Sequence, residues 1–266
     1  MKSLKGDDVI TITEVLKKGK VYRIKVNHET LEIEPEVVLK YRIKPLMTYD
    51  EKTYQSLLDD QDFHHYRKKG LKKLSRMMTS YEMKTYLNAE ACKDRIVKQI
   101  IKDFELKGYL NDAIYVKNYI EIKKFSEGPE VITYKLLQKG IQKELIDQGL
   151  ETLDEKDILT QLIPQKAKSQ KKESIRQMTL KLKTYFVRKG FSLDIIDEVM
   201  QKHLDWSNVS EQDIILKEFS KIYKQYAKKL EGYELKKKIY EKLYQKGYQK
   251  NDIEYALKEL DTLQNN

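Results

Sequence analysis

The chain contains few of the residues that interrupt helices or cross-link a fold. Its 266 residues include four prolines and one cysteine, Cys92. No proline lies between Pro45 and Pro129 or after Pro164. Because proline ends or kinks a helix, this spacing predicts long uninterrupted helices. A single cysteine excludes an intramolecular disulfide and is typical of a reducing cytoplasm, so we expect a cytoplasmic protein in which Cys92 packs on a helix.

The sequence also lacks membrane and catalytic signatures. It has no apolar run of about 18 residues and no apolar core of a signal peptide near its start. The four histidines form no i,i+4 pair for zinc. Neither a phosphate-binding loop, a Gly-x-Ser-x-Gly motif nor a dinucleotide fingerprint occurs. We therefore expect no membrane contact, no catalytic residue, no metal and no cofactor, and a protein that is not an enzyme.

Positive charge is in excess and is unevenly distributed. The chain has 52 lysines and arginines against 42 acidic residues, a net charge of +10. Residues 165–190 carry nine basic groups, among them Lys171 and Lys172, against Glu173 alone. Such stretches are either solvated helix faces or surfaces that attract a phosphate backbone, without sequence preference and weakly at high salt. From the residues alone, both interpretations stay open.

One short pattern occurs three times. Gly140, Gly190 and Gly247 each follow a basic residue. Each of these glycines also has an apolar residue four positions before it and isoleucine six positions after it. The pattern predicts a helix that ends at a left-handed glycine and a new helix beyond it. The glycines are 50 and 57 residues apart, which indicates helical units in tandem. A step of 50 residues back from Gly140 reaches Glu90, with Leu87 before it, and predicts a fourth copy without glycine. Tandem units usually form a long surface for another macromolecule.

The N-terminal part departs from this helical pattern. Apolar and polar residues alternate over residues 9–33 around two turns, which predicts an antiparallel sheet of about three strands. A helix is expected to begin at Pro35, a residue that suits the first helical turn, and to run through Tyr41.

Helix signals dominate the rest of the chain. Most of the 19 tyrosines lie at helical spacing beside leucine and isoleucine, so packing is favoured over base stacking; Tyr244 is one of them. The further expectations are a helix near Asp50–Leu58, a second helix entered through Phe63–Tyr66, a helix over Arg95–Lys107, caps at Ser80, at Ser192 and at Asn111 or Asp112, a turn at Gly108, a helix start at Gly128-Pro129, and a break between helices at Pro164 and Gln165–Glu173.

Several of these segments together resemble a known family. The resemblance is carried by Leu-Lys-Lys-Leu-Ser-Arg at residues 71–76, Gly108–Asp112, Tyr115–Tyr119, Gly128-Pro129, residues 136–141, residues 188–192 and residues 246–248. In this combination the chain resembles the RecX regulatory proteins, which modulate the RecA recombinase. The N-terminal sheet and helix resemble the extension of the long RecX proteins of Gram-positive bacteria. Met77-Met78-Thr79 departs from the family, which has a turn with arginine and proline there.

The resemblance implies both a fold and a function. The implied fold is mainly α, with tandem three-helix repeats in an elongated curved array and a small N-terminal antiparallel sheet. The implied domains are residues 1–48 for the sheet and its helix, and 49–107, 108–153, 154–207 and 208–266 for four repeats. The implied function is binding of a monomer to RecA–DNA filaments. Binding would inhibit the recombinase, ATPase and co-protease activities of RecA in recombinational DNA repair and the SOS response.

With this resemblance, basic residues become the candidate contacts to the RecA filament and to single- or double-stranded DNA. Four recur at helix ends before or beside the repeated glycines: Lys139, Arg188, Lys189 and Lys246. Lys181, Lys183, Lys236 and Lys237 add to them. The same positions also suit the negative end of a helix dipole, a purely structural reason for their presence.

Two other functions remain as alternatives. A DNA-binding regulator built from tandem helix-turn-helix-like units would read the major groove with one helix. The chain has no helix with clustered Arg, Asn and Gln for base edges, which weakens this alternative. The other alternative is a protein-interaction scaffold without a nucleic-acid role.

Overall fold

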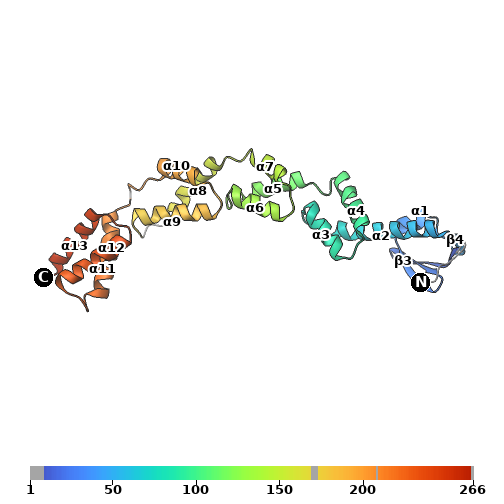
Figure 1. Ribbon diagram of the computed structural model, residues 1–266, viewed down its shortest axis with the longest axis horizontal. Coiled ribbons are helices and arrows are strands. Elements are labelled where there is room, and N and C mark those ends of the chain that lie inside the picture. Colours follow the sequence, from blue (N-terminus) through green and yellow to red (C-terminus); the bar gives the residue numbers. More distant parts are fainter. Residues whose placement is uncertain (1–8, 169–172, 208, 265–266) are drawn as a thin grey trace. The chain divides into compact units, whose positions relative to one another are not determined.

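The computed structural model describes residues 9–168, 173–207 and 209–264. In these ranges the chain forms one four-stranded antiparallel sheet followed by helices numbered to α13 (Figure 1). The mainly α class with a small N-terminal sheet is confirmed. Contacts divide the chain into two units, Met1–Asn118 with Leu136–Leu145, and Tyr119–Lys135 with Ile146–Asn266, and each is described by itself.

The sheet contains one strand more than the sequence predicted. Strands β1 (Ile10–Lys18), β2 (Val21–Val26) and β3 (Glu29–Ile33) form the expected meander, and β4 (Met47–Tyr49) pairs with the start of β1, giving the order β3-β2-β1-β4. Three residues are too few to show an alternating pattern, so β4 carries no signal of its own. Helix α1 (Pro35–Lys40) begins at proline as expected and buries Val37 against the sheet.

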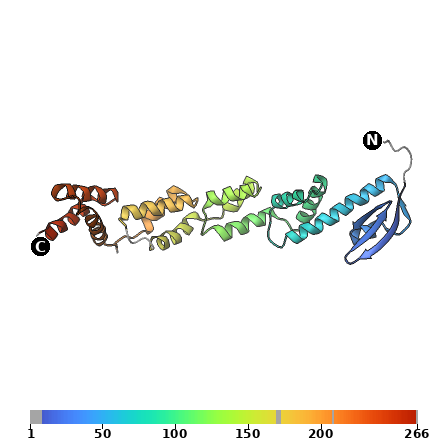
Figure 2. The ribbon, with the colours of Figure 1, turned by 90° about the horizontal axis from the view of Figure 1, so that it is seen from below.

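The two helices expected between residues 50 and 78 are a single helix, α2 (Glu51–Lys73). Asp50 caps it by accepting a hydrogen bond from the Thr53 amide at 2.6 Å, and no proline follows to interrupt it. Figure 2 shows α2 as one unbroken helix that leaves the sheet. Its first half buries Leu57 in the sheet core, whereas its second half packs Phe63 and Leu71 on the next cluster.

Eleven helices follow α2 in the described residues, and counted with α2 they make successive groups of three. They are α3 (Ser80–Ala89), α4 (Asp94–Leu106), α5 (Asp112–Lys123), α6 (Pro129–Gln138), α7 (Lys143–Leu150), α8 (Glu155–Ala167), α9 (Ile175–Arg188), α10 (Leu193–His203), α11 (Glu211–Tyr226), α12 (Gly232–Gln245) and α13 (Lys250–Gln264). The expected break between helices does fall after Gln165, since α8 ends at Ala167 and α9 begins at Ile175, but Pro164 is not part of it and lies inside α8. The helix continues through it to Ala167, which is buried in the α8–α10 core.

The cap of α3 is one residue earlier than the sequence suggested. The Thr79 hydroxyl accepts a hydrogen bond from the Glu82 amide, and the Glu82 carboxylate accepts one from the Thr79 amide, both at 3.1 Å. This is a capping box, and Ser80 is the first helical residue. The spacing Thr-x-x-Glu was a signal for it, since three residues after Ser80 stands Met83.

We expect Thr79→Ala to lower the free energy of unfolding by about 1–2 kcal/mol, because it removes a helix cap and a buried hydrogen bond. Ser80→Ala is the matched control: its hydroxyl bonds only the exposed Glu105, so a change within about 0.5 kcal/mol is expected. Urea unfolding followed by circular dichroism measures both. Equal losses in the two variants would contradict the assignment of Thr79 as the cap.

Of the other expected caps, Asn111 makes a cap hydrogen bond and Ser192 does not. Asn111 caps α5, because its side-chain oxygen accepts from the Ile114 amide at 3.0 Å, while Asp112 accepts from the Ser80 amide at 2.8 Å. Ser192 stands at the N-cap of α10, but its hydroxyl makes no cap hydrogen bond. It donates to Glu155 instead, at 2.9 Å.

The repeated glycines end their helices in the left-handed conformation, with φ of 75° at Gly140, 87° at Gly190 and 85° at Gly247. The fourth copy has the same geometry at Ala91, with φ of 60°. The amide of the residue after Ala91 bonds the Leu87 carbonyl at 3.2 Å, as happens after each glycine. The predicted alignment of this copy on Glu90 is therefore wrong by one residue, because a non-glycine turn hides the register.

Each glycine turn also contacts the helix group before it, through the carbonyl of the preceding residue. The Lys139 carbonyl accepts from the Thr79 hydroxyl at 2.8 Å, and the Lys246 carbonyl accepts from the Ser174 hydroxyl at 2.7 Å. The Lys189 carbonyl accepts from the amide of Gly128 at 2.7 Å. All three donors stand at the start of a helix, α3, α9 or α6, so the turn joins one group to the next.

Candidate interaction surface

The predicted contact residues gather on α9 and α12 and on the turns that follow α6, α9 and α12. Lys181, Lys183 and Arg188 lie on α9, and Lys236 and Lys237 lie on α12. Lys139, Lys189 and Lys246 directly precede the three glycines. Two residues of the basic stretch 165–190, Lys171 and Lys172, lie outside the described residues.

Lys139 has a structural role that its sequence position did not reveal. Its ammonium group lies 2.6 Å from the Glu82 carboxylate, and the hydrogen bond to this carboxylate raises the pKa of Lys139. The ammonium also lies 5.7 Å from the centre of the Tyr115 ring. Side chain and carbonyl of Lys139 therefore both hold α3, which makes this lysine the least available of the set.

Three further lysines form ion pairs at the surface. Lys181 pairs with Glu173 and Lys183 with Asp197, both at 2.6 Å. Lys246 lies 3.1 Å from Glu218. Burial raises the pKa of Glu218, but hydrogen bonds from two lysines, Lys246 among them, outweigh burial and lower it. Exposed pairs such as those of Lys181 and Lys183 contribute only about 0–1 kcal/mol, so a phosphate can replace these two partners at small cost.

Arg188 and Lys237 are the most available cations of the predicted set. Both side chains are exposed, and within the part of the chain that the structure describes neither forms an ion pair. Arg188 is suited to bidentate contact with a carboxylate or phosphate, and Lys237 acts as a point charge. Lys189 is half-buried, with its ammonium 5.8 Å from the Tyr185 ring centre.

Exposed apolar side chains accompany these cations, a feature that the sequence analysis missed. Three positions before each glycine stand Leu137, Val187 and Tyr244, which are 44%, 43% and 60% exposed. Core or edge packing was expected of Tyr244; it lies at the edge, stacked on the neighbouring Tyr240 and still largely exposed. The sequence did hold a signal for this exposure, because Tyr244 stands at the same distance before its glycine as Leu137 and Val187 do. Exposed apolar side chains beside exposed cations suit binding to a macromolecule.

The described residues contain no group of three or more histidine, cysteine, aspartate or glutamate side chains that could hold a metal ion. None of the helices in the described ranges is both long and apolar enough to cross a membrane. Cys92 is buried, and burial raises the pKa of its thiol to about 11. A thiol with that pKa is a poor nucleophile, so Cys92 belongs to the core.

Fold and surface thus define a helical-repeat protein with a small N-terminal sheet, and with exposed cations and exposed apolar side chains at the helix ends. Comparison with known proteins gives its relationship. The chain is 31% identical over 255 residues to regulatory protein RecX of Streptococcus agalactiae serotype Ia. The matched residues cover 93% of this chain and 98% of the relative. It is 30% identical over 256 residues to regulatory protein RecX of Streptococcus pneumoniae (strain Hungary19A-6), with the same coverage. The chain belongs to the RecX family of regulatory proteins.

Solved structures agree on the fold. A crystal structure of a regulatory protein RecX matches with a TM-score of 0.59 and 19% identity, over 72% of this chain and 99% of that one. A crystal structure of RecX from Lactobacillus salivarius matches with a TM-score of 0.50 and 25% identity, over 53% and 96%. No protein-family model matches the chain.

Proposed function

We propose that this chain binds RecA–DNA filaments and inhibits the ATPase, recombinase and co-protease activities of RecA, and so regulates recombinational DNA repair. The observation that carries the proposal is the relationship to regulatory RecX proteins over nearly the full length of both chains. A surface of repeated helices, with Arg188 and Lys237 exposed, supports it, because a filament is itself a repeating and negatively charged partner.

DNA contributes to this binding through its phosphates. Seven of the eight predicted contact residues are lysines, which supply charge without reading base edges. Affinity for DNA should therefore be independent of sequence and should fall steeply as salt rises. The negatively charged groove of a filament would orient the protein, and the exposed apolar side chains would contact protein subunits.

The test is a titration into preformed RecA–single-strand-DNA filaments while ATP hydrolysis is followed. We expect hydrolysis to fall at a ratio of about one chain to several RecA subunits, because tandem helical units would contact more than one subunit of a repeating partner. An unchanged rate at that ratio would show that RecA is not the target. Tight binding to one duplex sequence that persists at high salt would instead support the helix-turn-helix alternative.

A further inference from the structure

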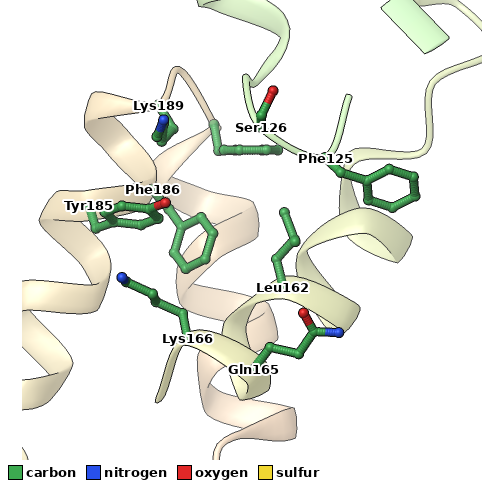
Figure 3. A pocket seen from close by; sticks show the side chains of 9 residues that line it. Phe125, Ser126, Leu162, Gln165, Lys166, Tyr185, Phe186 and Lys189 are labelled. Carbon is green, nitrogen blue, oxygen red and sulfur yellow. The ribbon is translucent and has the colours of Figure 1, made fainter. Parts of the chain in front are cut away.

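A pocket of about 240 Å³ lies between α8, α9 and the turn after α5. All nine lining residues belong to one of the two units. Figure 3 shows Tyr185 and Phe186 on one side, and Phe125 and Leu162 on the other. Phe125 and Tyr185 are 49% and 38% exposed, so the aromatic walls are accessible from solvent. Pockets for whole small molecules span about 300–1,000 Å³, so this one is sized for a single ring system.

The electrostatics of the pocket favour an anion. The ammonium groups of Lys166 and Lys189 lie 4.7 Å and 5.8 Å from the centre of the Tyr185 ring, which holds both cations at the pocket. None of the nine described lining residues is acidic. Gln165 and Ser126 add hydrogen-bonding groups. Aromatic walls, two cations and an amide are together the set that recognises a planar ring attached to a phosphate.

We propose that this pocket binds one unstacked nucleotide of single-stranded DNA. The base would stack on Phe125 and contact the edge of the Tyr185 ring, because the two ammonium groups lie over that ring, and the phosphate would lie at Lys166 and Lys189. Base stacking on aromatic side chains is tolerant of sequence, as is the phosphate contact, so the site would hold any strand. The inference rests on the proposed function, since it assigns the DNA component of that partner to a particular site.

An acidic peptide is the competing occupant, because lysines attract carboxylates as well as phosphates. The walls favour the nucleotide: Phe125 and Tyr185 are exposed aromatic side chains, and a flat base covers such rings better than an acidic side chain does. The alternative without any ligand is that the pocket is only a packing gap at the turn between α5 and α6. In that case Phe125 and Tyr185 would make no difference to DNA binding.

The test compares two probes of equal charge, a fluorescent thymidine oligonucleotide and an abasic oligonucleotide of the same length. The full chain should bind the thymidine strand about fivefold more tightly. Tyr185→Leu and Phe125→Ala should remove this preference, whereas Tyr185→Phe, which keeps the ring, should retain it. Tyr233→Ala removes an exposed aromatic residue on α12, away from the pocket, and should also retain it.

Equal binding of both probes by the unaltered chain would overturn the proposal, as would an undiminished preference in Tyr185→Leu. A peptide of glutamate and phenylalanine is expected to displace neither probe. If this peptide binds at Tyr185 and the thymidine strand does not, the pocket is a peptide site instead. The measurement contains no RecA. Failure of the pocket and failure of RecA inhibition are therefore separate results.

Discussion

Replacing Gly190 with alanine is expected to lower the free energy of unfolding by about 3 kcal/mol. Two costs combine at this residue. Its φ of 87° is disfavoured for any residue with a Cβ, at about 1–2 kcal/mol. A Cβ would also lie 2.6 Å from the Val131 amide nitrogen, a backbone atom that cannot move without shifting α6, and such overpacking costs about 1–3 kcal/mol.

Two other glycines separate these costs. Gly108 has a φ of 70° and no atom within 4 Å of its Cβ position, so Gly108→Ala should cost only about 1 kcal/mol. Gly128 is not among the positive-φ residues, but its Cβ would lie 2.3 Å from the Gly190 backbone, so Gly128→Ala reports the close approach alone. Urea unfolding by circular dichroism gives all three values. A loss in Gly108→Ala equal to that in Gly190→Ala would show that the contact between helix groups contributes nothing.

Within the proposed function, reversing the charge of Arg188 and Lys237 together should raise the concentration needed for half-inhibition of the RecA ATPase by about tenfold or more. Each substitution by glutamate replaces attraction to the filament with repulsion. Because neither side chain forms an ion pair among the described residues, the fold should be unaffected. Lys246 is left unchanged, because a carboxylate at that position would repel Glu218 and so disturb the fold as well as the contact with the filament.

The control keeps the same change in net charge at another place. Lys98 and Lys102 are exposed on α4, and reversing both should change half-inhibition by less than about threefold, the long-range share of the charge effect. Circular dichroism confirms that helicity is equal in the two variants. If Arg188→Glu with Lys237→Glu inhibits as well as the control, the contact lies on other residues.

Much of the fold could be predicted because its signals are local. The meander over residues 9–33, the start of α1 at Pro35 and the helix ends at the repeated glycines all follow from neighbouring residues. The errors share a cause. Strand β4 is defined by its pairing with β1, and the turn at Ala91 is left-handed without the glycine that would mark it, so neither feature has a signal in the neighbouring residues.

The candidate surface was less predictable than the fold. Lys139, Lys189 and Lys246 were selected as equivalents because each directly precedes a glycine, yet their ammonium groups have different partners. That of Lys139 faces a carboxylate and an aromatic ring, and that of Lys189 faces an aromatic ring. That of Lys246 faces a carboxylate that a second lysine also contacts. Their carbonyls, which sequence analysis did not consider, do share one role. Spacing along the chain fixes which backbone atoms recur, but it does not fix which partner a long flexible side chain meets.

The sequence by itself determined the helical class, the tandem copies, the excess of positive charge and the relationship to RecX proteins, since each depends on composition or on residues close together in the chain. The tertiary structure decided which cations are occupied, where the turns contact the preceding helices and where aromatic side chains form a pocket. Those features join residues such as Thr79 and Lys139 or Phe125 and Tyr185, which lie 60 positions apart and meet only after the chain has folded.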